Sequence, residues 1–245
     1  MSIFSIITYD YVKELPLLLK KRLNGQSLEV TVESDDKTFR AAIHTNSEEQ
    51  VRGLCEAVAE LILLDLRHFE MASLVDRLPF DIADKRRILP SALKSSAQYI
   101  DISKAADEIR SYFDENTELN VEGYLHFRMQ ETIELWRVHV DIAAEERILH
   151  AECLELIGLL STYCSIRSNG NVHLDIILQP DGSCTVTDGN CLRIECDHNG
   201  DDGIIGLIVG LSPSNLTIYD LSQGRFDALK ETIKLIFGTK VDTFS

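Results

Sequence analysis

Four residues late in the chain carry side chains that suit a metal ion. They are Cys184, Cys191, Cys196 and His198. Thiolates and an imidazole are typical ligands of zinc, but structural zinc sites usually place two cysteines about 2–4 residues apart on a tight turn. Here six and then four residues separate successive cysteines, which fall on expected strands. The spacing favours ordinary strand and turn cysteines over a metal site.

A second group has the residue types of acid–base chemistry. His173 and Asp175 alternate with apolar neighbours on an expected strand and so share one face of it. A histidine base also needs a nucleophile within about 3 Å. Asp201 and Asp202 precede an expected helix, where N-capping explains them more simply than a calcium loop does. The four residues form the alternative site of a hydrolase or metal-dependent enzyme, if they converge.

A long helical repeat dominates the middle of the chain. Apolar residues recur there at steps of three and four, on one face of a helix: Leu125, Met129, Ile133, Trp136, Val140 and Ala144. This stripe must be buried, and its continuation from Leu149 to Leu160 is nearly in phase. A single helix over this span would be roughly 50 Å long. We therefore expect a bend or break between Ala143 and Ile148, giving two packed helices.

The remaining periodicities alternate between strand and helix. The N-terminal part has a strand, a helix and a hairpin, and the region 71–116 is helical with interruptions at Leu78-Pro79 and Leu89-Pro90. After Gly170 the period changes to that of strands, and two helices follow. The expected C-terminal strands are 172–177, 184–187, 192–195 and 215–219, and the expected helices are 202–211 and 225–237.

These elements predict an α+β fold. It comprises a small N-terminal β-α-β-β unit (residues 1–45), a central helical bundle (46–168) and a C-terminal β-meander with two helices (169–245). A chain of 245 residues can bury one sizeable core or two smaller ones.

The net charge and the hydropathy of the chain limit the classes of partner and the compartment that we expect. A net charge of −16 argues against binding to nucleic acid or to anionic membranes, since both require a basic surface. The first residues do not read as a secretory signal, and the longest apolar run, near Gly203–Leu211, is too short to cross a bilayer. We expect a cytoplasmic protein whose six cysteines are mostly free thiols.

Several motifs between residues 119 and 241 resemble those of the YtxC-like family of sporulation proteins. LNVEGYLHFR is similar to the family's Gly-Phe-x-x-Phe-Arg motif, with Gly123, Phe127 and Arg128 in place. ECLELIGLLSTYCSI resembles its Glu-Phe-Ile-x-Leu-Leu-x-Tyr-Phe-Val segment. Pro213 and Phe237 match the proline and phenylalanine of two later segments, Asp-x-Leu-Ile-x-x-Leu-x-x-x-x-Pro and Thr-Ile-x-x-Ile-Phe-x-x-x-Val.

The resemblance implies a cytoplasmic, sporulation-associated protein, and it carries over no catalytic residues, cofactor or metal. We expect a non-enzymatic protein that acts through contacts with a protein partner, and the sequence leaves its oligomeric state open. Gly123 would allow close backbone approach, and Arg128 would pair with a carboxylate, preferably within the protein. The alternatives are the enzyme built on His173 and a small-ligand sensor with an apolar cavity.

Overall fold

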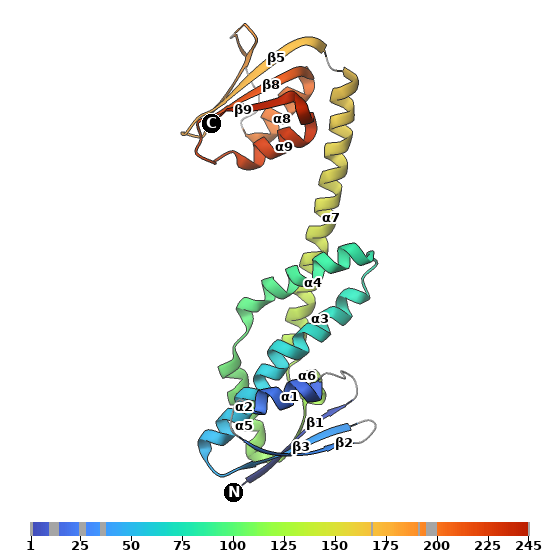
Figure 1. Cartoon of the computed structure of the whole chain (residues 1–245), viewed down its shortest axis with the longest axis vertical. Helices are drawn as coiled ribbons and strands as arrows, with labels where there is room; N and C mark the ends of the chain where they lie inside the picture. Colours follow the sequence, from blue (N-terminus) through green and yellow to red (C-terminus); the bar gives the residue numbers. More distant parts are fainter. Residues whose placement is uncertain are drawn as a thin grey trace. The chain divides into compact units, whose positions relative to one another are not determined.

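The chain divides into two compact units, residues 1–147 and 148–245 (Figure 1). A computed structural model describes residues 2–9, 15–24, 28–34, 38–167, 169–190, 192–194 and 200–244. Each unit has its own sheet and its own hydrophobic core. The α+β class is confirmed.

The first unit contains a mixed four-stranded sheet of order β2-β3-β1-β4. Its strands are β1 (Ser2–Tyr9), β2 (Glu29–Ser34), β3 (Thr38–Thr45) and β4 (Glu118–Asn120). Strands β1, β2 and β3 pair antiparallel, and β4 joins β1 in parallel. Phe4 lies opposite Ile43, and both are buried in the core. The expected order β-α-β-β is present within this larger unit, and its sheet gains a fourth strand, β4, from residues 118–120.

Among the described residues, six α-helices precede the long helix that begins at Gln130. They are α1 (Leu15–Asn24), α2 (Glu48–Glu60), α3 (Arg67–Asp76), α4 (Ile82–Ser96), α5 (Ile102–Glu115) and α6 (Val121–Arg128). A π-helical segment, η1 (Leu61–Leu66), joins α2 to α3, and a short 3-10 turn, η2 (Ala97–Tyr99), follows α4. Ser47 caps α2 by accepting a hydrogen bond from the Gln50 backbone N–H, as its type predicts.

One of the two interruptions expected at prolines is absent. The helices do separate around Pro79, but α4 continues through Pro90. Proline removes one backbone hydrogen bond from a helix and disturbs the preceding turn. Pro90 is exposed, whereas Ile88 and Ala92 on either side of it are buried in the core. Packing of these neighbours keeps the segment helical.

The long helix is also more continuous than expected. Helix α7 runs from Gln130 to Arg167 without a break near Ala143, so the predicted division there is wrong. The interruption lies earlier, at Met129, whose φ of −113° and ψ of 37° end α6. Neither proline nor glycine occurs between Gln130 and Gly158 to stop the helix.

No helix in the described ranges is long and apolar enough to cross a membrane.

The apolar stripe is buried as expected in its first half, but only partly in its second half. Trp136 and Val140 are almost fully buried, in a core that also contains Leu125 and Ala144. Further along α7, Leu149 and Leu156 are exposed, contrary to expectation. Ile157 and Leu160 are partly buried against the second core, so the two halves of the stripe pack against different cores, and Leu149 and Leu156 face neither of them.

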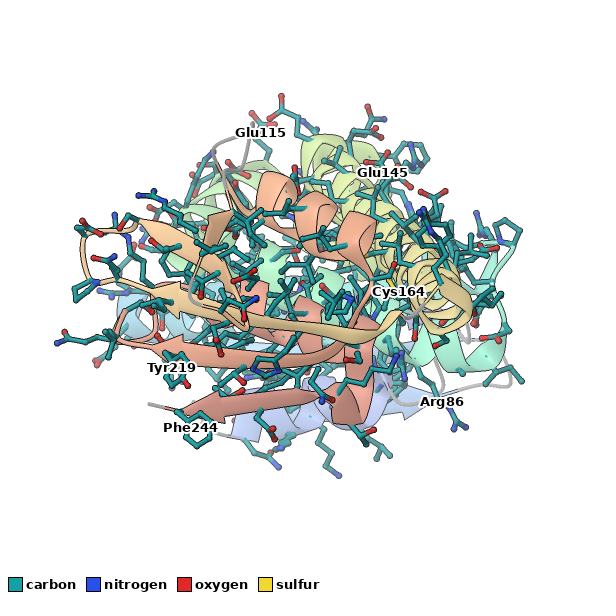
Figure 2. The ribbon with its side chains drawn as sticks, turned by 90° about the horizontal axis from the view of Figure 1, so that it is seen from above. Arg86, Glu115, Glu145, Cys164, Tyr219 and Phe244 are labelled. Atoms are coloured by element: carbon teal, nitrogen blue, oxygen red, sulfur yellow. The ribbon has the colours of Figure 1, made fainter. Side chains whose placement is uncertain are left out.

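The second unit contains a five-stranded sheet of order β7-β6-β5-β8-β9. The strands are β5 (Asn169–Leu178), β6 (Cys184–Asp188), β7 (Arg193–Ile194), β8 (Pro213–Asp220) and β9 (Val241–Phe244). Strands β5, β6 and β7 form the expected antiparallel meander, and β8 and β9 extend the sheet in parallel. Tyr219 and Phe244 lie opposite each other on β8 and β9 with stacked rings (Figure 2).

Two helices complete this unit. They are α8 (Asp201–Leu211) and α9 (Asp227–Phe237), close to their expected bounds, and a 3-10 turn, η3 (Gly238–Lys240), follows α9. Ile208 of α8 and Ile233 of α9 pack with Ile176 of β5 in one buried cluster. Cys164 on α7 is buried in the same cluster.

Candidate functional site

The Gly-Tyr-Leu-His-Phe-Arg motif forms helix α6, and its start is fixed by a tight cap. The Asn120 side-chain Oδ1 accepts a hydrogen bond of 2.5 Å from the Gly123 backbone N–H. A Cβ atom at residue 123 would lie 2.7 Å from that oxygen, closer than real Cβ contacts allow. An alanine at residue 123 would therefore displace the cap, and the group that approaches Gly123 is the Asn120 side chain rather than the backbone expected from the sequence.

Aromatic packing holds the inner face of α6 in the first unit. Tyr124 is buried, and its ring meets that of Tyr112 edge to face with 5.3 Å between centroids. Burial raises the pKa of the Tyr124 phenol to about 12, so the group stays neutral. The Tyr112 hydroxyl donates a hydrogen bond of 3.2 Å to the Glu118 backbone carbonyl. These contacts anchor α6 to α5, and α5 to β4.

The last turn of α6 presents two side chains outward. Phe127 is 81% exposed, which is unusual for a large aromatic residue, and the adjacent Arg128 is exposed as well. The expected internal salt bridge of Arg128 is not seen, since no carboxylate of the described residues forms an ion pair with it. Its cationic group lies at a helix C-terminus, where the helix dipole favours positive charge.

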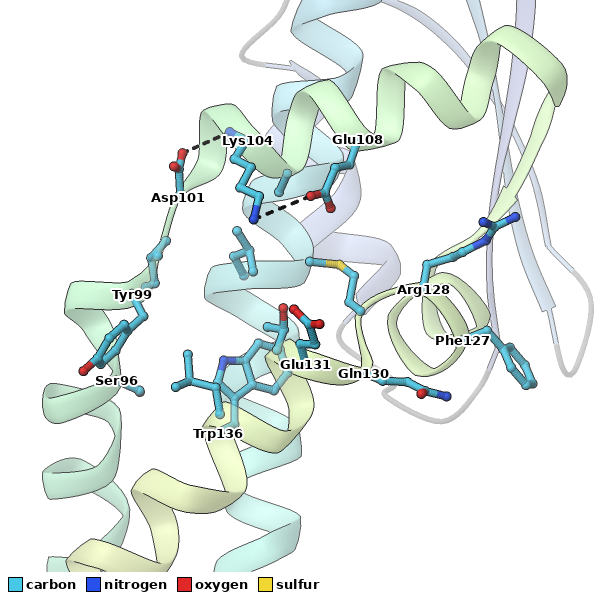
Figure 3. A pocket seen from close by; sticks show the side chains of 16 residues that line it. Ser96, Tyr99, Asp101, Lys104, Glu108, Phe127, Arg128, Gln130, Glu131 and Trp136 are labelled. Carbon is cyan, nitrogen blue, oxygen red and sulfur yellow. Dashed lines mark hydrogen bonds and ion pairs between the residues drawn. The ribbon is translucent and has the colours of Figure 1, made fainter.

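A cavity of about 510 Å³ adjoins this turn (Figure 3). Phe127 and Arg128 are among its lining residues, with Gln130 and Glu131 from the start of α7. Figure 3 shows Trp136 on the α7 side of the cavity and Lys104 on the α5 side. The family motif thus lies at a hollow between α5, α6 and the first turns of α7.

The cavity wall is mixed, because charged side chains from α5, α6 and α7 lie among apolar ones such as Ile100, Met129 and Leu135. The Lys104 ammonium lies 3.9 Å from the Glu108 carboxylate, and Asp101 caps α5 by accepting from the Lys104 backbone N–H at 3.0 Å. The loose Lys104–Glu108 pair is well exposed and contributes little to stability. The apolar cavity that would favour a small-ligand sensor is not this one. Spacing of Lys104 and Glu108 by four residues predicts their pairing, but the sequence did not place them at the motif.

In the second unit, the structure brings His173 and Asp175 together. The His173 Nε2 lies 3.2 Å from an Asp175 carboxylate oxygen and 3.2 Å from the Thr217 hydroxyl on β8. Both partners meet the same ring nitrogen. A histidine relay uses one nitrogen for the nucleophile and the other for the carboxylate. The cluster therefore lacks the geometry of a nucleophile, base and acid in series.

Asp201 and Asp202 occupy the first turn of α8 and are exposed. Helix α8 packs on the core face of the sheet through Ile204 and Ile208. His173 and Asp175 alternate with the buried residues of β5 and so lie on the opposite face. The structure brings the two pairs into no common contact.

No group of three or more His, Cys, Asp or Glu side chains within the described ranges could hold a metal ion. Of the zinc candidates, Cys184 begins β6, whereas Cys191, Cys196 and His198 lie outside the described residues. Cys55 and Cys164 are buried, and burial raises the pKa of the Cys55 thiol to about 12. That thiol is therefore a small apolar core group at neutral pH.

The two later motif positions are structural. Pro213 is the buried first residue of β8, where a missing backbone N–H is tolerated. Phe237 ends α9 and is buried in the second core. Thr217 was not foreseen in the sequence, although its register opposite Asp175 follows from the parallel pairing of β5 and β8.

The chain is thus an α+β protein with two sheet-containing units and an exposed Phe-Arg pair beside a cavity lined by charged and apolar side chains. The YtxC-like family model matches residues 80–242, about two thirds of the chain. The chain belongs to the YtxC-like family. No curated protein and no solved structure matches it.

Proposed function

We propose that this protein is a cytoplasmic sporulation factor that acts by binding a protein partner through the last turn of α6. The observation that carries the proposal is the exposure of Phe127, 81% of whose surface is open beside the cavity. The sporulation role is proposed from the resemblance of the sequence motifs to those of the YtxC-like family, and the docking role is proposed from this surface.

Phe127 and Arg128 indicate which side chains the partner would need. Exposed aromatic residues and arginines are the types that contribute most to protein interfaces. The Phe127 ring would bury apolar surface, and the Arg128 guanidinium would form paired hydrogen bonds with a carboxylate. The partner segment would therefore carry an acidic side chain close to an apolar one. Its acid would meet Arg128 at the edge of an otherwise acidic molecule.

Helix α6 is held in place by its neighbours, so its last turn would form a docking surface before any partner binds. The Asn120 cap and the buried Tyr124 ring hold α6 at its start and along its inner face. A side chain on a well-supported turn loses less conformational freedom on binding than one on a mobile loop.

The test is sporulation frequency in an endospore-forming host whose own copy of this gene is replaced by variants. Phe127→Ala and Arg128→Ala are each expected to lower the frequency while leaving the thermal unfolding midpoint of the purified protein unchanged. Both side chains are exposed, so neither substitution disturbs the core.

Matched controls lie in the same unit. Ile82 is 71% exposed at the start of α4, and Arg86 is an exposed arginine on that helix. Ile82→Ala and Arg86→Ala should sporulate like the parent. Normal sporulation by the Phe127→Ala, Arg128→Ala double variant would remove this surface from the function.

A further inference from the structure

Helix α7 carries a second apolar stripe in the second unit, and it is open to solvent. Its six positions follow one another at steps of three, four, three, four and three: Leu149, Glu152, Leu156, Leu159, Tyr163 and Ile166. This is the spacing of a coiled-coil seam. The exposed fractions of Leu149, Leu159 and Ile166 are 64%, 63% and 80%.

The stripe is distinct from the face that α7 uses within its own unit. Cys164 is buried in the second core, and Ile157 and Leu160 pack against that core. At about 100° per residue these three positions lie roughly 100° around the helix from the open stripe. The same stretch of α7 therefore has one face covered by its own unit and another left open.

The open stripe is symmetric about its centre. Taken from the ends inward, Leu149 corresponds to Ile166, Glu152 to Tyr163, and Leu156 to Leu159. Two such helices packed antiparallel would place apolar residues opposite each other in the outer and central layers. A parallel pair would instead bury Glu152 against its own copy, which like-charge repulsion and desolvation disfavour.

The layer that pairs Glu152 with Tyr163 of the other copy is complementary in charge. Arg167 donates a hydrogen bond to the Tyr163 hydroxyl, and its guanidinium carbon lies 5.4 Å from the centre of that ring. In the antiparallel arrangement Glu152 of one copy meets this Tyr163–Arg167 pair of the other, twice per dimer. Residues 148–167 contain only Glu152, Glu155 and Arg167 as charged side chains with histidine neutral, a net −1 against −16 for the chain. Two acidic copies can approach closely here.

We infer that the occupant of this stripe is a second copy of the chain, packed antiparallel through residues 149–167 to form a two-fold dimer. The interface is isologous, since each copy presents the same surface to the other. The inference concerns the second unit and is independent of the docking role proposed for Phe127 and Arg128.

Sedimentation equilibrium of the purified full chain over a wide concentration range tests it. The parent protein is expected to show a monomer–dimer equilibrium. Leu159→Glu should raise the dissociation constant about tenfold or more, because each dimer would bury two added charges. Leu154→Glu is the matched control: Leu154 is also exposed on α7 but lies off the stripe, and its substitution should leave the constant unchanged. Far-ultraviolet circular dichroism checks that both variants stay folded.

Charge exchange tests the antiparallel register. Glu152→Arg and Arg167→Glu should each weaken the dimer, and the two substitutions in one chain should restore it. A monomer at every concentration would overturn the inference, as would a dimer that Leu159→Glu leaves intact. A double exchange variant no tighter than either single variant would also overturn it.

Discussion

Gly123 leaves the space that the capping side chain of Asn120 occupies. The Asn120 side chain closes over the first turn of α6 and leaves no room for a Cβ atom at residue 123. The Gly-x-x-x-Phe-Arg spacing in the sequence indicated close approach there, but the identity of the approaching group required the structure. Likewise, the exposure of Phe127 could not be foreseen, because an apolar residue on a helical repeat is ordinarily assigned to the core.

A double-mutant cycle at Asn120 and Gly123 tests this local account. In the Asn120→Ala background, Gly123→Ala should raise the free energy of unfolding by about 0.5–1 kcal/mol, the usual gain of alanine over glycine in a helix. In the parent protein the same substitution displaces the cap, which costs about 1 kcal/mol and cancels that gain. Chemical denaturation measures the free energy of unfolding of the parent, the two single variants and the double variant. Equal effects of Gly123→Ala in both backgrounds would contradict the account.

At the scale of elements, helices and strands with a clear apolar period could be predicted from the sequence, but the residues at which they end were harder to predict. Strands β5 to β8 and both helices of the second unit follow from alternation and turn residues, whereas η1 and the short strands β4 and β9 carry no distinct pattern. Helix α7 shows why. Its apolar stripe predicts a helix correctly, but whether a stripe is covered depends on what packs against it. Trp136 meets the first core and Leu156 does not.

An ion pair joins α9 to the end of β8 and gives the second unit a defined response to acid. Asp220 accepts hydrogen bonds from the Lys230 ammonium and from the Ser222 hydroxyl and backbone N–H, and only 6% of its side chain is exposed. The Lys230 hydrogen bond, followed by those from Ser222, lowers the pKa of Asp220 from its usual 3.8 to about 2. Its contribution to stability is therefore complete above about pH 4 and is lost as the pH falls towards 2.

Asp220→Asn should lower the free energy of unfolding at pH 7 by about 1–2 kcal/mol, because it removes a charged acceptor from a largely buried site. The loss is limited, since Lys230 keeps Asp227 at 2.7 Å. Denaturation curves between pH 7 and pH 2 should show the difference from the parent shrinking below about pH 4. Asp227→Asn, at a 69% exposed side chain, is the control and should have little effect. A difference that does not depend on pH would contradict the assignment.

At the scale of the whole molecule, the α+β class was predictable because alternating and helical periods occupy separate parts of the chain. The candidate site was predictable only as a motif. Its cavity depends on side chains from α5, such as Lys104, that are distant from Arg128 in sequence. The convergence of His173 with Thr217 likewise depends on strand register, which a single sequence does not specify.

Two separate cores predict two responses to core substitution. Trp136, the single tryptophan of the chain, is buried in the first core and reports on that unit alone. Ile218→Ala, in the second core, should cost about 2–5 kcal/mol in that unit while leaving the fluorescence-detected transition of Trp136 in place. Ile62→Ala, in the first core, should shift that transition. Identical shifts for both variants would show that the cores unfold as one.

If the last turn of α6 is a docking surface, Phe127 contacts another protein during sporulation. A photo-crosslinking amino acid in place of Phe127, activated in sporulating cells, detects that contact, and the same group at Ile82 is the control. A discrete crosslinked product is expected from position 127, absent from position 82 and diminished by Arg128→Ala. The same products from both positions, or no product from position 127, would exclude a docking role for Phe127.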